Sequence, residues 1–75
     1  YLIKNYDEAE KYIKRAVELM PEDPTVNDHY GDILWKLDRK IQARYFWKNV
    51  LSFDDTDKDM IEKINIKIIE GLKNS

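Results

Sequence analysis

The stretch that decides the fold is residues 42–53, QARYFWKNVLSF, because residues 8–19, EAEKYIKRAVEL, carry the same pattern 34 positions earlier. Ala9 and Tyr12 return at this interval as Ala43 and Phe46. The echo continues with a second set of large side chains, Val26, Tyr30, Leu34 and Trp35, which return as Met60, Ile64, Ile68 and Ile69. A period of this length indicates stacked supersecondary units, which usually form binding surfaces and not reaction centres.

The composition excludes several classes of protein. The 75 residues are 37% charged with a net charge of −2, whereas nucleic-acid-binding domains are normally basic on one face. There is no cysteine for a disulfide or a thiolate metal site, no apolar run near the length of a membrane span, and no secretory signal. We therefore expect no nucleic-acid partner and no membrane insertion. Because the chain opens at Tyr1 and not at Met, we interpret it as a piece of a longer protein.

Helical spacing of apolar residues begins close to the start of the chain. Residues 1–4 are interpreted as the tail of a helix, after which Asn5 and Glu8 form a predicted capping box. The helix that follows ends before Pro21, which cannot continue it. Its predicted apolar face is Ala9, Tyr12, Ile13, Ala16, Val17, Leu19 and Met20.

A second helix is predicted to begin at a strong punctuation signal. Asp23 is its expected N-cap, and Pro24 occupies the first helical position, where a missing N–H costs nothing. Asp38 and Arg39 form the next turn, since Asp tolerates the left-handed conformation better than most residues. The inward face is expected to be Val26, Tyr30, Ile33, Leu34 and Leu37.

Two further helices complete the predicted all-α class. The third runs from about Lys40 to Phe53, with Ile41, Ala43, Phe46, Trp47, Val50 and Leu51 inward and Tyr45 pointing outward. Thr56 with Asp59 is a weaker capping box for the fourth helix, which runs to about Leu72. The apolar face of this last helix is Met60, Ile61, Ile64, Ile68 and Leu72.

The small and aromatic positions of this pattern resemble the tetratricopeptide repeat (TPR) family. Gly31 matches the small position of that family's first helix, and the other matching residues are Ala43, Trp47 and Val50 in one unit and Ala9, Ala16 and the helix-ending Pro21 in the unit before it. The sequence departs from the family at Asn27, Asp38, Asp55 and Asn65. Gly31 opposite Ala43 would let two nearly antiparallel backbones approach closely.

The resemblance implies an antiparallel helix-turn-helix α-solenoid, a TPR-like superhelix fragment from the C-terminal end of a repeat protein. We expect three full helices plus an N-terminal helical stub in a single module. Residues 1–23 form a partial repeat, residues 24–57 a complete repeat, and residues 58–75 a closing helix, since Asn65 replaces the small residue of a further repeat.

One polar stretch, residues 27–32, offers a candidate for chemistry. His29 and Asp32 lie three positions apart and can share a helix face, an arrangement used for metal binding and for proton transfer. A metal site needs about three protein ligands, and this stretch adds only Asp28 to a single His. We therefore predict no metal, no cofactor and no enzyme, and we interpret these residues as a solvated or capping network.

The resemblance implies a second use for the same residues, because first helices of TPR units line a concave groove that holds extended peptides. The groove residues projected here are Thr25, Asp28, His29, Asp32, Trp35 and Lys36, with Asp59, Glu62, Ile66 and Ile69 from the last helix. Asp28 and Asp32 would repel the terminal carboxylate that chaperone-binding members clamp. Alternatively, both aspartates pair with Lys36 one turn further along.

Trp35 also has two interpretations. It lies beside the apolar strip of its helix, where it would act as an aromatic anchor for a partner or would pack on Ile66 and Ile69 of the last helix. We favour packing for part of its surface.

The predicted function is a non-catalytic scaffold whose groove binds a peptide or helix of a partner protein. The alternative is a structural module that forms homo-oligomers through uncovered apolar faces. Ile66 and Ile69 fall outside the core strip of the last helix, and Tyr12 and Leu19 are left uncovered on the first.

Overall fold

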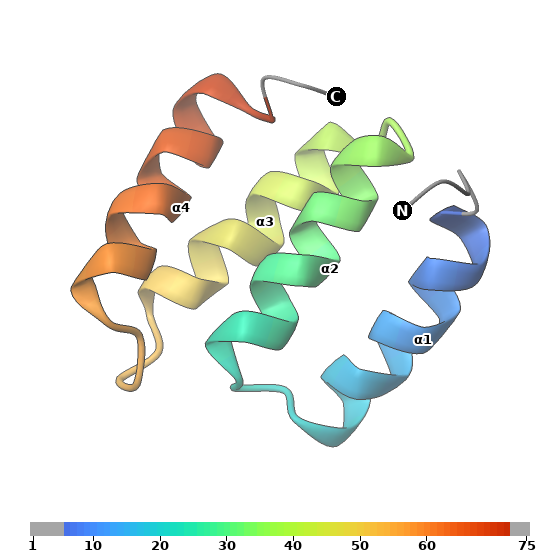
Figure 1. Ribbon diagram of the computed structural model, residues 1–75, viewed down its shortest axis with the longest axis horizontal. Coiled ribbons are helices and arrows are strands. Elements are labelled where there is room, and N and C mark those ends of the chain that lie inside the picture. Colours follow the sequence, from blue (N-terminus) through green and yellow to red (C-terminus); the bar gives the residue numbers. More distant parts are fainter. Residues whose placement is uncertain (1–5, 73–75) are drawn as a thin grey trace.

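The computed structural model describes residues 6–72, and every regular element in that range is an α-helix (Figure 1). The helices are α1 (Tyr6–Leu19), α2 (Pro24–Lys36), α3 (Lys40–Leu51) and α4 (Lys58–Glu70). The predicted all-α class is therefore confirmed. The prediction of three full helices plus a stub was wrong, because α1 is a full helix of 14 residues. The predicted helix tail at residues 1–4 and the Asn5 cap lie outside the described residues.

The 34-residue period reappears in the helix boundaries. α1 begins at Tyr6 and α3 at Lys40, while α2 and α4 span Pro24–Lys36 and Lys58–Glu70. Both boundaries of α2 and α4 are thus 34 residues apart, as are the starts of α1 and α3, whereas the ends of α1 and α3 are 32 residues apart. The described part of the chain therefore consists of two similar halves, α1 with α2 and α3 with α4.

Two equivalent aspartates begin α2 and α4. The Val26 N–H donates to Asp23 Oδ1 at 3.0 Å, and the Met60 N–H donates to Asp57 Oδ1 at 2.8 Å. The predicted Asp23 cap is confirmed. The capping box predicted for Thr56 was wrong, because the Thr56 hydroxyl donates to the Val50 carbonyl at 2.7 Å and so belongs to the preceding turn.

The helix ends depend on single residues in special conformations. Asp38 has a φ of 65°, which confirms the left-handed turn predicted between α2 and α3. α3 ends at Leu51 and α4 at Glu70, two residues earlier than the predicted ends at Phe53 and Leu72. Gly71, with a φ of 74°, terminates α4 because this conformation breaks the helix and suits glycine.

Consecutive helices are antiparallel neighbours. Figure 1 shows them side by side in chain order, with α1 and α4 at the two outer ends of the array, and the packing pairs are α1 with α2, α2 with α3, and α3 with α4. The two central helices therefore have a helix on each side, whereas each outer helix has one. No helix within residues 6–72 is both long and apolar enough to cross a membrane.

The core lies mainly between α2 and α3. Its fully or nearly fully buried members are Tyr30, Leu34, Ala43, Trp47, Val50 and Ile64. The ring of Tyr30 contacts that of Phe46 across the α2–α3 interface, with 4.5 Å between centroids. α1 contributes no fully buried residue, although Ile13 and Val17 pack against this core.

The space beside Gly31 of α2 is filled by a side chain of α3. A Cβ built at Gly31 would lie 2.4 Å from Nε1 of Trp47, so the indole of Trp47 occupies the space that the missing side chain leaves. Ala43, the residue predicted to lie opposite Gly31, is fully buried as well. The small residue in α2 thus serves to seat the large aromatic of α3.

Several residues assigned to apolar faces are exposed. Ile41 was predicted to point inward, but 86% of its surface is accessible. Tyr12 and Leu19 of α1 are also exposed, which agrees with the expectation that their face lacks a cover. Tyr45 is exposed, as predicted.

A buried amide holds the α1–α2 connection. Asn27 is 2% exposed, and its side-chain N–H group donates to the carbonyls of Pro21 at 3.1 Å and Asp23 at 2.9 Å. A buried amide is favourable only when its polar atoms are paired, as they are here. Asn27 therefore fixes the turn between α1 and α2.

Candidate functional site on the face of α2 and α4

A charged cluster joins α2 to α4. The Lys67 ammonium of α4 donates to Asp28 Oδ1 at 2.8 Å and to both carboxylate oxygens of Asp32, at 3.0 and 3.2 Å. Asp28 and Asp32 lie one helical turn apart on α2, so both side chains reach the same point on α4. The three side chains are mostly shielded from solvent, with 20%, 18% and 33% exposed for Lys67, Asp28 and Asp32. We name these three residues the carboxylate–lysine cluster.

Trp47 forms the floor of this cluster. Its Nε1–H donates to Asp32 Oδ1 at 3.2 Å, and the Lys67 ammonium lies 5.9 Å from its ring centroid. The buried indole N–H is thereby satisfied, which a fully buried tryptophan requires. The cluster therefore draws on α2, α3 and α4 together.

The titration of two cluster groups is perturbed. Burial raises the pKa of Asp32 above its ordinary 3.8, assisted by the charge of Asp28 and opposed by the hydrogen bond from Lys67. Burial by itself would lower the pKa of Lys67, but its hydrogen bonds and charge interactions with Asp28 and Asp32 outweigh burial and raise it above 10.5. Lys67 is therefore held in its charged form by two carboxylates.

The alternative in which Asp28 and Asp32 pair with Lys36 was wrong. Both aspartates pair with Lys67 instead. Lys36 lines a shallow hollow of about 240 Å³ between α2 and the start of α1, together with Tyr6, His29, Asp32 and Ile33. Only Asp32 belongs both to this hollow and to the carboxylate–lysine cluster.

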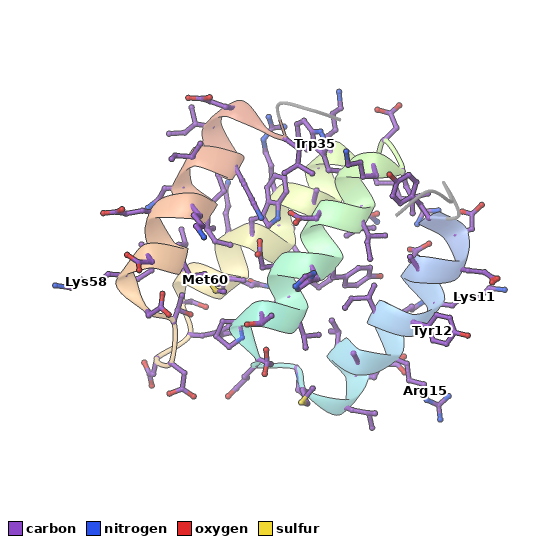
Figure 2. All side chains as sticks on the ribbon, viewed as in Figure 1. Lys11, Tyr12, Arg15, Trp35, Lys58 and Met60 are labelled. Atoms are coloured by element: carbon purple, nitrogen blue, oxygen red, sulfur yellow. The ribbon has the colours of Figure 1, made fainter. Side chains whose placement is uncertain are left out.

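Trp35, in the last turn of α2, lies between the end of α4 and the start of α3 (Figure 2). Its ring stacks on that of Trp47 with 5.6 Å between centroids, and the cationic groups of Lys40 and Arg44 lie 5.0 and 5.1 Å from its centroid. A Cβ at Gly71 would lie 2.2 Å from the Trp35 ring, so the turn that ends α4 covers it. Trp35 is therefore packed, as predicted, but its contacts are Trp47 and the turn at Gly71. The partners that were predicted for it, Ile66 and Ile69, are exposed.

The remaining predicted groove residues border the cluster. Thr25 and His29 are exposed on α2, and Ile66 and Ile69 are exposed on α4. Among residues 6–72, no group of three or more His, Cys, Asp or Glu side chains is arranged to hold a metal ion. The face thus combines an ion cluster with polar and apolar side chains at its margins.

Two basic residues of the site were missed from the sequence. Lys67 was overlooked because it lies 35 positions from Asp32. The signal for it was the pair of carboxylates four residues apart, which is stabilised when a cation from a neighbouring helix lies between them. Arg44 was also missed, and its Nε–H donates to the Ile68 carbonyl of α4 at 3.0 Å. A further ion pair joins Arg39 to Glu10 of α1 at 2.6 Å.

Comparison of the chain with protein-family models, with curated proteins and with solved structures gave no match.

Proposed function

We propose that this chain is a non-catalytic protein-interaction scaffold of the TPR type, with the α2–α4 face as a groove that binds a peptide or helix of a partner protein. The observation that carries the proposal is the carboxylate–lysine cluster. It holds two helices that are not consecutive in the chain in a fixed relation, and exposed side chains border it on both helices.

The repeated helix boundaries support a solenoid arrangement of the two halves. α2 and α4 occupy equivalent positions 34 residues apart, and each follows its predecessor through a connection capped by an aspartate. In such an arrangement equivalent helices line the same surface, so a bound segment would run across both. Thr25, Asp28, His29, Asp32 and Lys36 would contribute from α2.

The charge of the face favours one kind of partner. Two carboxylates share one ammonium in the cluster, which leaves an excess negative charge, and Asp59 and Glu62 add exposed acidic groups on α4. Complementary potentials favour binding, and like charges oppose it. The partner segment would therefore present a lysine or arginine and not a terminal carboxylate.

Selection of peptides from a displayed random library on the immobilised chain tests this function. Enriched peptides should carry Lys or Arg, and Thr25→Lys should weaken the best of them about tenfold, equivalent to roughly 1.4 kcal/mol. Thr25 suits this test because it is exposed and lies outside the cluster, so the fold should be retained.

Gln42→Lys is the matched control. Gln42 is exposed near the start of α3, and its replacement adds the same positive charge away from the α2–α4 face. If both substitutions weaken binding equally, or if the selected peptides are acidic, the assignment of the groove to this face is wrong.

A further inference from the structure

Apolar side chains are exposed at both ends of the helix array. On α1, Tyr12 and Leu19 are 78% and 75% exposed, and Figure 2 shows Tyr12 projecting away from α2. On α4, Ile66 and Ile69 are 52% and 77% exposed. Large apolar side chains gathered on one face of a helix are typical of contact sites.

The interior of the molecule shows what equivalent residues do when they are covered. In the α2–α3 interface the Phe46 ring meets Tyr30, and Trp47 stacks on Trp35 while donating to Asp32. Asp32 and Trp35 thus lie on the side of α2 that receives α3.

Residues 34 positions apart in the sequence occupy equivalent places in the helices, so the outer helices can be compared with the inner ones. Asp32 and Trp35 of α2 correspond to Ile66 and Ile69 of α4, and this correspondence matches the helix boundaries. The exposed side of α4 therefore corresponds to the side of α2 that packs on α3.

The same displacement applies to α1. Phe46 and Phe53, which pack against the core, correspond to Tyr12 and Leu19. The exposed side of α1 therefore corresponds to the side of α3 that packs on α2. Each end of the array carries one half of an interface that the molecule already forms internally.

We propose that the occupant of both faces is a second copy of this chain, stacked head to tail so that α4 of one copy packs on α1 of the next as α2 packs on α3. Such an interface is heterologous and leaves one α1 face and one α4 face free at the ends, so the assembly grows with concentration. The α2–α4 face would continue from copy to copy.

The charges of the two faces are complementary. Lys11 and Arg15 flank Tyr12 on the outer side of α1 (Figure 2), where they line an open hollow of about 400 Å³ with Glu8. On the exposed side of α4, Ile66 has Asp59, Glu62 and Glu70 near it and one basic residue, Lys63, so acidic groups outnumber basic ones. Opposite charge on the two faces favours pairing of α1 with α4 over pairing of either face with itself.

This inference does not rest on the proposed function. Ile66 and Ile69 border the groove as well, but the equivalent residue Asp32 serves both surfaces, since it accepts from Trp47 of α3 and pairs with Lys67 of α4. The peptide test uses Thr25 and can fail or succeed whether or not copies stack.

Two end-blocked variants test the stacking. Tyr12→Glu with Leu19→Glu blocks the α1 face, and Ile66→Glu with Ile69→Glu blocks the α4 face. Sedimentation velocity is measured from about 10 µM to 1 mM, a range that covers modest affinities. The average mass of the unmodified chain should be above the 9.1 kDa of one copy and should rise with concentration. Each blocked variant should remain a monomer, and an equimolar mixture of the two should form a 1:1 dimer and nothing larger.

Ile41→Glu is the matched control, because Ile41 is an exposed isoleucine on neither end face and its replacement should leave association unchanged. Circular dichroism checks that all variants keep their helix content. A monomeric unmodified chain across the whole range overturns the proposal, and so does continued self-association of either blocked variant. A mixture that forms no dimer also overturns it.

Discussion

At the scale of single residues, Asp32 is the position on which most interactions converge. It accepts hydrogen bonds from Lys67 and from the buried Trp47 indole, and it lies one turn from Asp28. Burial nevertheless raises its pKa, so its charged form is less favourable in the folded protein than in water. Asp32 organises the face while costing part of the free energy of folding.

This cost predicts a pH dependence with a definite sign. A carboxyl whose pKa is higher in the folded than in the unfolded state binds protons more readily when folded, so its contribution to the free energy of unfolding rises as pH falls from the folded pKa toward 3.8. Asp32→Asn cannot titrate there. We expect the stability of the unmodified chain to increase relative to Asp32→Asn as pH falls from 7 toward 3.8, measured by urea unfolding.

Carboxyl ¹³C titration by NMR provides the independent check on this residue. It should give a pKa for Asp32 above 3.8 in the folded chain. A value at or below 3.8, or a stability difference that does not change with pH, would contradict the burial argument.

At the scale of elements, the repeated unit is a helix that begins at a capping aspartate. Asp23 and Asp57 accept from backbone N–H groups three residues further on, and Pro24 adds a preset backbone angle to the first of these helices. These are local interactions, which explains why α2 and α4 begin at equivalent positions although their side chains differ.

Removal of either cap should therefore have a similar cost. We expect Asp23→Ala and Asp57→Ala each to lower the free energy of unfolding by about 1 kcal/mol, because each leaves a backbone N–H at the helix start without its acceptor. Urea unfolding followed by circular dichroism measures the loss.

The control for the caps is Asp54→Ala, since Asp54 is an exposed residue in the same connection as Asp57. Its effect should stay within about 0.5 kcal/mol. A loss at Asp54 equal to that at the two capping positions would show that general charge, and not capping, is responsible.

At the scale of the whole molecule, burial is distributed unevenly across the array. The buried apolar residues lie on α2 and α3, with Ile64 as the only such residue on α4 and none on α1 within residues 6–72. α4 is held in addition by Lys67 and by the bond from Arg44 to the Ile68 carbonyl. α1 depends on half-buried contacts and on the ion pair between Glu10 and Arg39.

Native-state hydrogen exchange should reflect this distribution. We expect amides of α1 to exchange through openings of lower free energy than amides of α3, because few buried contacts are lost when α1 separates. NMR or mass spectrometry at low micromolar concentration measures this order. Equal protection of α1 and α3 in the monomer would contradict it.

The sequence by itself determined the features that depend on near neighbours in the chain. The Asp23 cap, the left-handed Asp38, the 34-residue period and the exposure of Ile66 and Ile69 were all predicted correctly. Each follows from interactions within about one helical turn or from the periodicity of apolar residues, which the order of residues alone contains.

Only the tertiary structure decided which distant groups meet. It paired Asp28 and Asp32 with Lys67 and not with the nearby Lys36, and it placed Trp47 in the space beside Gly31. A surface pair one turn apart on a helix contributes little, whereas a cation from a neighbouring helix reaches carboxylates that are largely shielded from water. Such choices depend on how α2, α3 and α4 pack, and that arrangement is absent from any local pattern.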